Sequence, residues 1–177
     1  MGAESVTVCF TGNPNCGKTT LFNAYTGAGK KTANWPGVTV ALSEGSLMHR
    51  GRLVHLVDTP GIYSLDPYTM EETVTRQCIR DQKADVIIHV ADALLLERSL
   101  FLTMQLLAEG KPLVLALNMM DLVRERGMDI DTEGLSRLLG GIPVIPPLPA
   151  PIRITPSRWT RPPSPPESPA GGWGELP

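Results

Sequence analysis

The chain has 177 residues, a formal net charge of −2 at pH 7 and a pI near 5.9. This length allows one domain with a real core, and the weak acidity gives no electrostatic support for nucleic-acid binding. The three cysteines are odd in number and form no C-x-x-C pair, which favours a reducing cytoplasm over a disulfide framework or a zinc site. With no visible signal peptide and no apolar run near the ~20 residues of a membrane span, we expect a soluble, cytoplasmic domain.

Strand and helix patterns alternate from residue 1 to about residue 142. Apolar runs predict strands over residues 6–10, 39–48, 52–57, 86–90 and 112–117. Apolar periodicity predicts helices over 17–26, 71–81, 97–108 and 131–139, the last with Asp131 as its N-cap. We therefore predict an α/β fold with a mostly parallel sheet and helices on both faces. A hairpin turn at His49-Arg50-Gly51 adds one antiparallel edge strand.

The composition changes from residue 143 onward, where 12 of the 17 prolines lie. We predict a domain over residues 1–146, with its final strand and helix incomplete, and a Pro-rich, largely disordered tail over 147–177. The tail is either a P-x-x-P ligand, at Pro162/Pro165 or Pro163/Pro166, or a segment without selected structure, which the composition favours. The abrupt change also suggests out-of-frame translation or a truncated gene model.

The segment 12–19 fits the phosphate-loop pattern G-x-x-x-x-G-K-[ST] between a predicted strand and a predicted helix. Backbone N–H groups and the helix dipole there suit a nucleotide triphosphate, whereas a chance glycine-rich turn is the alternative. Lys18 would meet the β- and γ-phosphates, and the Thr19 hydroxyl would ligate Mg²⁺. The residues expected around the phosphates are Gly12, Asn13, Pro14, Asn15, Cys16, Gly17, Lys18, Thr19 and Thr20.

A second motif, Asp58-Thr59-Pro60-Gly61, follows a predicted strand. Asp58 would hold Mg²⁺ through a water, and the Gly61 N–H would approach the γ-phosphate; an ordinary Asp-containing turn is the alternative. Thr39 lies between the two motifs, where its hydroxyl and carbonyl could complete the Mg²⁺ ligands, or it simply starts the next strand. We take Lys18, Thr39 and Gly61 as the candidate catalytic residues.

A third motif, Asn118-Met119-Met120-Asp121, follows the predicted strand 112–117. The Asp121 carboxylate could accept hydrogen bonds from guanine N1–H and the N2 amine together, a donor pair that adenine does not offer. Asn118 would tie this loop back to the phosphate loop. The three motifs in this order predict a binding site for GTP and GDP.

These residues resemble the N-terminal G domain of the bacterial ferrous iron transport protein B (FeoB). The resemblance covers residues 6 to about 146 and rests on GNPNCGKTTLFN at 12–23, NWPGVTV at 34–40, DTPGIYSL at 58–65 and NMMD at 118–121. It implies a P-loop GTPase fold, with Mg²⁺ held by Thr19, Thr39 and Asp58, guanine read by Asn118 and Asp121, and Gly37 and Val38 beside the nucleotide.

The resemblance also implies a biological role. This domain would be the cytoplasmic regulator of a ferrous iron transporter in the bacterial inner membrane. In the full-length family a helical domain and a membrane permease follow, and no sequence that resembles either is found here. The family's fifth guanine-contact loop is not recognisable after residue 146 either.

Two positions bear on turnover. Asn15 matches the asparagine that ligates K⁺ in potassium-activated members; a turn residue in the left-handed conformation is the equal alternative. Ile62 stands where Ras-like GTPases carry a water-orienting glutamine, so we predict slow GTP hydrolysis. Two alternatives stay open: a fragment that binds guanine nucleotide weakly without turnover, and another small GTPase, of the RNA-modification or ribosome-assembly type.

Overall fold

The computed structural model describes residues 5–27, 31–34, 39–80 and 84–146. Its helices are α1 (Lys18–Thr26), α2 (Met70–Arg80), η2 (Ala93–Leu95), α3 (Leu96–Ala108), α4 (Met120–Glu125) and α5 (Thr132–Leu138). Its strands are β1 (Val6–Gly12), β2 (Lys31–Asn34), β3 (Ala41–His49), β4 (Arg52–Asp58), β5 (Val86–Asp92), β6 (Leu113–Asn118) and β7 (Val144–Ile145). The predicted Pro-rich tail, 147–177, lies outside the described residues.

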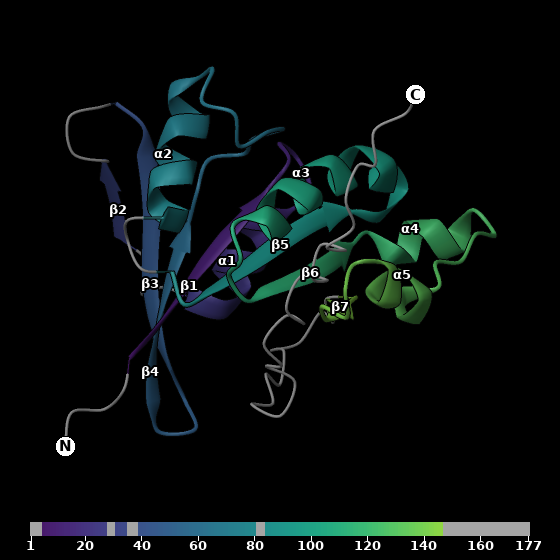
Figure 1. The fold of residues 1–177 in the computed structure, drawn as a ribbon. Coiled ribbons are helices and arrows are strands. Elements are labelled where there is room, and N and C mark those ends of the chain that lie inside the picture. Colours follow the sequence, from purple (N-terminus) through teal and green to yellow (C-terminus); the bar gives the residue numbers. More distant parts are fainter. Residues whose placement is uncertain (1–4, 28–30, 35–38, 81–83, 147–177) are drawn as a thin grey trace, which may run out of the picture.

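In the described part of the chain the strands form one sheet in the order β2-β3-β4-β1-β5-β6-β7 (Figure 1). The strands β4, β1, β5, β6 and β7 are parallel, and β3 pairs antiparallel with both β4 and β2. The predicted α/β class is confirmed. The antiparallel strand is not at the edge, however, because β2 pairs along its outer side. The sequence of β2, Lys-Thr-Ala-Asn, has no apolar alternation, so only its pairing with β3 makes it a strand.

The predicted hairpin turn is confirmed between β3 and β4. Arg50 and Gly51 have φ values of 50° and 77°, the two positive values of a two-residue hairpin loop whose twist matches that of its strands. The turn sets the register of β4 against β3. On its other side β4 pairs parallel with β1, and Asp58 lies opposite Phe10. Since parallel strands end at one edge of a sheet, the residues that follow β1, β4 and β6 gather there.

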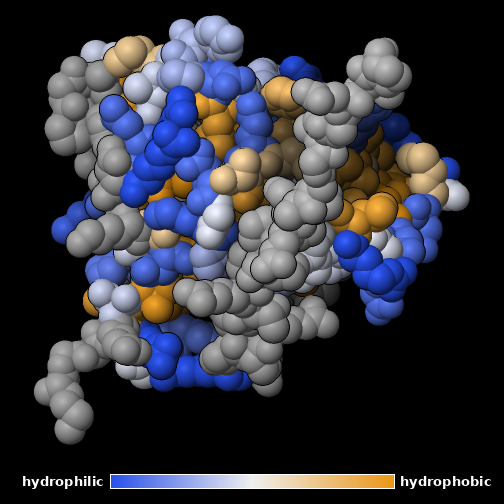
Figure 2. Space-filling view, in the orientation of Figure 1, coloured by the Kyte–Doolittle hydropathy of each residue, from blue (hydrophilic) through white to orange (hydrophobic). Residues whose placement is uncertain are grey.

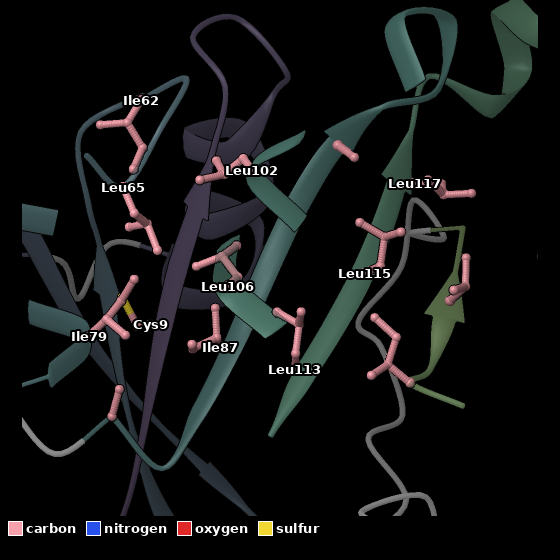
Figure 3. Packing of buried hydrophobic residues seen from close by; sticks show 14 of the residues in the cluster. Cys9, Ile62, Leu65, Ile79, Ile87, Leu102, Leu106, Leu113, Leu115 and Leu117 are labelled. Carbon is pink, nitrogen blue, oxygen red and sulfur yellow. The ribbon is translucent and has the colours of Figure 1, made fainter. Parts of the chain in front are cut away.

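Apolar side chains cover both faces of the sheet. The larger cluster joins the sheet to α2 and α3 and includes Cys9, Ile79, Ile87, Leu102 and Leu106 (Figure 3). The smaller cluster lies on the opposite face, where Phe22 of α1 packs edge-on against Phe10 of β1. Because β1 and β5 are buried on both faces, their sequences read as continuous apolar runs.

The helices largely match the prediction. Asp131 caps α5 as expected, accepting a hydrogen bond from Gly134 N at 2.8 Å. The short α4 and η2 were not predicted. Apolar residues also reach the surface in Figure 2, in the region where α3 and α4 lie. Phe101 and Met104 of α3 are among the exposed apolar side chains of the described residues. None of the helices in the described segments is both long enough and apolar enough to cross a bilayer.

Candidate functional site

The phosphate-loop motif connects β1 to α1 at the carboxyl edge of the sheet, as its sequence predicts. Gly17 is the N-cap of α1 in the left-handed conformation (φ 84°), and no acidic residue lies in the first turn of the helix. The first N–H groups of a helix have no partner within it and carry partial positive charge. This helix start is therefore suited to an anion, and no side-chain carboxylate of its own first turn competes for it.

The first two motifs are in direct contact. Lys18 Nζ forms an ion pair with Asp58 Oδ1 and donates to the Thr59 carbonyl, while Thr19 Oγ1 donates to Asp58 Oδ2 at 2.9 Å. Lys18 and Asp58 are both buried, and each charge is compensated by the opposite charge of its partner. Thr59 is tied to β1 in turn, since its N–H and hydroxyl both donate to Phe10 O.

The third motif reaches the phosphate loop through Asn118. Its Nδ2 donates to the Cys16 carbonyl at 2.9 Å across 102 residues of sequence. A Cβ atom built on Gly17 would lie 2.2 Å from the same Nδ2, so only glycine lets Asn118 come this close. The prediction that Asn118 ties the two loops together is confirmed.

Asp121 lies beyond this link. Met119 turns the chain with φ 63°, and Asp121 follows in the first turn of α4, exposed to solvent. Within the described segments the Asp121 side chain forms no hydrogen bond or ion pair. Its carboxylate is thus available at the carboxyl edge of the sheet, as a residue that reads a base must be.

Gly61 and Ile62 fasten the segment after β4 to the phosphate loop. A Cβ atom on Gly61 would lie 2.9 Å from Pro14 Cα, and Ile62 N donates to Gly12 O at 3.0 Å. Glycine is therefore required at 61 for packing against the loop, a reason that the sequence interpretation did not contain. The Ile62 side chain is 2% exposed and lies with Leu65 in the larger apolar cluster (Figure 3). The side chain at position 62 is therefore part of the hydrophobic core.

The remaining candidate residues are only partly joined to this group. Thr39 is exposed, two residues before β3, and no contact between it and Lys18, Thr19 or Asp58 is found in the described part of the chain. Gly37 and Val38 lie outside the described residues. Asn15 is exposed with φ 63°, which is the turn conformation that one of its two interpretations predicts.

Cys16 and Asn13 lie inside the phosphate loop. Burial raises the pKa of the Cys16 thiol above its usual value, so the thiol stays neutral and packs as a small side chain. Asn13 is buried as well, and its Oδ1 is one of the few buried side-chain atoms of the described residues that has no hydrogen-bond partner. An unpartnered polar atom in a loop of this kind fits a site that receives a polar ligand.

Hard oxygen donors converge where the sequence places Mg²⁺. The Thr19 hydroxyl and the Asp58 carboxylate meet at 2.9 Å beside the start of α1, and oxygen atoms are the ligands that Mg²⁺ prefers. The residues present therefore fit a magnesium ion.

The sequence analysis missed two features next to the site. Gln105 of α3 contacts the chain at Ser64, Leu65 and Asp66, a link across about forty residues that no local pattern signals. Thr69 and Glu72 cap the start of α2 reciprocally: Glu72 N donates to Thr69 Oγ1 at 3.2 Å and Thr69 N to Glu72 Oε2 at 2.9 Å. The T-x-x-E pattern of this capping box was visible in the sequence.

Comparison with protein families identifies the chain. A sequence model of the family described as ferrous iron transport protein B matches residues 6–150. The chain belongs to this family. The match begins at the first residue of β1 and extends four residues past the last described one, so it includes all the motifs of the candidate site.

Relatives agree with this assignment. The Fe(2+) transporter FeoB of Legionella pneumophila (strain Paris) is 50% identical over 133 residues, covering 73% of this chain and 18% of that protein. FeoB of Salmonella typhimurium is 44% identical over 147 residues, covering 81% of this chain and 19% of that protein. This chain thus spans less than a fifth of the length of the curated relatives it matches.

Solved structures of the family share the fold. The cytosolic domain of L. pneumophila FeoB is 49% identical, with a TM-score of 0.75, over 80% of this chain and 60% of that one. The cytosolic domain of T. maritima FeoB in a GDP form is 41% identical, with a TM-score of 0.77, over 81% and 56%. The predicted FeoB resemblance is confirmed, and the fold is that of a P-loop GTPase G domain.

Proposed function

We propose that this chain binds GTP and GDP with Mg²⁺ and hydrolyses GTP slowly, as the cytoplasmic regulatory domain of a ferrous iron transporter. The observation that carries the proposal is the convergence of three separate motifs, through Lys18, Asp58 and Asn118, at one edge of the sheet. Support comes from the family relationship and from the solved relatives, whose cytosolic domains include GDP forms.

In this proposal the phosphates lie over the start of α1. The N–H groups at 17–19 and the Lys18 ammonium meet their oxygens, so Lys18 exchanges part of its pairing with Asp58 for the β- and γ-phosphates. Thr19 and Asp58 would hold Mg²⁺, which when bound neutralises charge on the phosphate oxygens. Thr39 would join these residues only while the γ-phosphate is present, which makes it the candidate for sensing the nucleotide state.

Base selection falls to the loop after β6. Asp121 is exposed and without a partner in the described part of the chain, and its two oxygens match the N1–H and N2 donors of guanine. Asn118 holds this loop at a set position relative to the phosphates through Cys16 O. We therefore propose guanine over adenine by at least a hundredfold, because adenine would leave the carboxylate unpaired.

Hydrolysis is proposed to be slow because no side chain at position 62 can orient water. Ile62 is apolar and buried, so the attacking water must be placed by the backbone of Gly61, by Thr39 or by a cation beside Asn15. The proposal further includes stimulation of GTP turnover by K⁺, which Asn15 would hold beside the phosphates.

The test is a nucleotide titration of the purified 177-residue chain, monitored by calorimetry in Mg²⁺ and repeated in K⁺ and in Na⁺. We expect micromolar GDP binding, no measurable ATP binding, and GTP turnover that is faster in K⁺ than in Na⁺. Asp121→Ala serves as the matched variant, which should lose GDP binding while its melting temperature stays unchanged, because Asp121 is exposed and unpaired.

Two other results would decide against the proposal. A folded chain without GDP binding would support the alternative of an inactive fragment. Equal affinity for ADP and GDP would refute base selection by Asp121. The alternative of an RNA-modification or ribosome-assembly GTPase is disfavoured by membership of the transport family.

A further inference from the structure

The segment between β4 and α2, residues 59–69, contains the Gly61 that the proposed function places near the γ-phosphate. It has no regular secondary structure, so its position depends on contacts with its neighbours. At its start it is fastened to the phosphate loop by the Ile62 N bond to Gly12 O at 3.0 Å. A few residues later it lies against α3.

Gln105 of α3 makes the contact with this segment. Its Oε1 accepts from Leu65 N at 2.8 Å, and its Nε2 donates to Ser64 Oγ at 3.1 Å and to Asp66 Oδ2 at 3.2 Å. The Ser64 hydroxyl also donates to Asp66 Oδ2 at 2.9 Å, so the three residues form one hydrogen-bonded network. Every bond in it crosses between α3 and 59–69 or lies within that segment.

The chemistry of the network requires an amide at position 105. A backbone N–H can only donate, so the Gln105 oxygen must face Leu65, which leaves the NH₂ group to face the Asp66 carboxylate. A carboxylic acid would supply the acceptor but set a second negative charge beside Asp66. An apolar side chain would supply neither group and would leave the buried Leu65 amide without a partner.

Two further kinds of contact hold residues 59–69 against α3. The Arg98 guanidinium lies 3.9 Å from the centre of the Tyr63 ring, a cation–π contact at the residue directly before Ser64 and Leu65. Ile62 and Leu65 lie in the same apolar cluster as Leu102 and Leu106 of α3 (Figure 3). The segment is therefore held at two points, the phosphate loop and α3, and Gly61 stands next to the first of them.

We propose that Gln105 is a positioning residue, which sets the place of Gly61 through Leu65 and so favours GTP over GDP and speeds GTP hydrolysis. This inference rests on the proposed function. Its physical basis is that Leu65 lies only four positions after Gly61, so releasing Leu65 frees the backbone that would meet the γ-phosphate. GDP has no γ-phosphate and does not depend on this position.

The test compares Gln105→Leu, Gln105→Glu and a matched control, Met104→Ala, whose exposed side chain is the neighbour of Gln105 on α3. Amide hydrogen exchange at Leu65 reads the bond directly, and we expect it to be about tenfold or more faster in Gln105→Leu. We expect single-turnover GTP hydrolysis to fall about tenfold or more and binding of a non-hydrolysable GTP analogue to weaken, with GDP affinity within about twofold of wild type.

A rescue separates positioning from general stability. Asp66→Asn added to Gln105→Glu supplies the donor that the carboxylate at 105 then accepts, so the double variant should recover much of the GTP preference that Gln105→Glu alone loses. Unchanged exchange at Leu65, or equal weakening of GDP and the GTP analogue, would overturn the positioning role. A wild-type chain that binds neither nucleotide would instead refute the proposed function, an outcome that is visible before any variant is made.

Discussion

The phosphate side and the guanine side of the candidate site are built differently. On the phosphate side, Lys18, Thr19 and Asp58 are linked directly to one another, and Thr59 is fastened to β1. On the guanine side, the described residues show one side-chain hydrogen bond, from Asn118 to Cys16 O, and an exposed Asp121. The phosphate side is thus organised by contacts within the protein, whereas the guanine side is organised by one amide.

The difference follows from the sheet. The phosphate loop and Asp58 follow β1 and β4, which are adjacent strands in the middle of the sheet, so their ends are buried by neighbours. The Asn118 loop follows β6, and beyond β6 the described sheet has only the two-residue β7. Fewer neighbours leave the guanine loop with fewer possible partners. The comparison predicts that the two sides respond differently to substitution.

On the phosphate side, the largest effect is expected at Lys18. Lys18→Ala removes the charge that would meet the phosphates and leaves Asp58 as a buried, unpaired carboxylate. We expect GDP binding to weaken by about 10- to 100-fold or more, which corresponds to about 1.5–3 kcal/mol for a hydrogen bond to a charged group. Calorimetry checks this, with the exposed Lys31→Ala as control. Unchanged affinity for inorganic pyrophosphate would contradict the assignment of Lys18 to the phosphates.

Substitution of Ile62 tests whether the segment beside the phosphate loop also contributes to the stability of the core. Ile62→Gln places an amide where the native side chain is 2% exposed, so we expect a loss of about 1–3 kcal/mol in the free energy of unfolding. Denaturant titration measures this, with Ile62→Val as the milder control. GTP turnover per folded molecule should stay the same, whereas Thr39→Ala should abolish it. A tenfold faster turnover in Ile62→Gln would show that position 62 does reach the water.

His89 lies in β5, between β1, which leads to the phosphate side, and β6, which leads to the guanine side. A change in its charge should therefore affect the stability of both sides. Its Nδ1 is 3.0 Å from Thr103 Oγ1, and since that hydroxyl donates to Ser99 O, Nδ1 must carry the ring proton. Burial lowers the pKa of His89 from 6.5 to about 3, so the native state holds it neutral while the unfolded state binds a proton below pH 6.5.

The contribution of His89 is fully present above pH 6.5 and is lost as the pH falls from 6.5 towards 3. We expect wild type to lose about 1 kcal/mol relative to His89→Gln between neutral pH and pH 5.5. Urea titrations at several pH values measure this, with His55→Gln as control. A His89→Gln variant with the wild-type pH slope would show that His89 is already charged in the native state.

The smallest effect is expected at Asn118. Asn118→Ala removes one neutral hydrogen bond, so we expect GDP affinity to fall by about 2- to 10-fold, or about 0.5–1.5 kcal/mol, while pyrophosphate binding stays as in wild type. Competition titrations with GDP and pyrophosphate distinguish the two sides. An equal loss for both ligands would show that the phosphate and guanine sides are not separable.

Much of the fold could be predicted because its elements have strong local patterns. β1, β5 and β6 are apolar runs, and the Arg50-Gly51 turn and the Asp131 cap are short-range signals. β2 could not be predicted, since a four-residue polar segment becomes a strand only by pairing with β3. The role of Ile62 in the core could not be predicted either, because most members of the apolar cluster it joins are distant from it in the sequence.

By itself the sequence determined the class of site: the three motifs, their order and the residue types that suit phosphate, Mg²⁺ and guanine. Only the tertiary structure decided how these residues are held. It pairs Lys18 with Asp58, brings Asn118 to Cys16, requires glycine at 61 against Pro14 and joins Gln105 to Leu65. The physical reason is that motif chemistry is local, whereas each of these contacts joins residues about 40 to 100 positions apart, whose meeting depends on strand order and register.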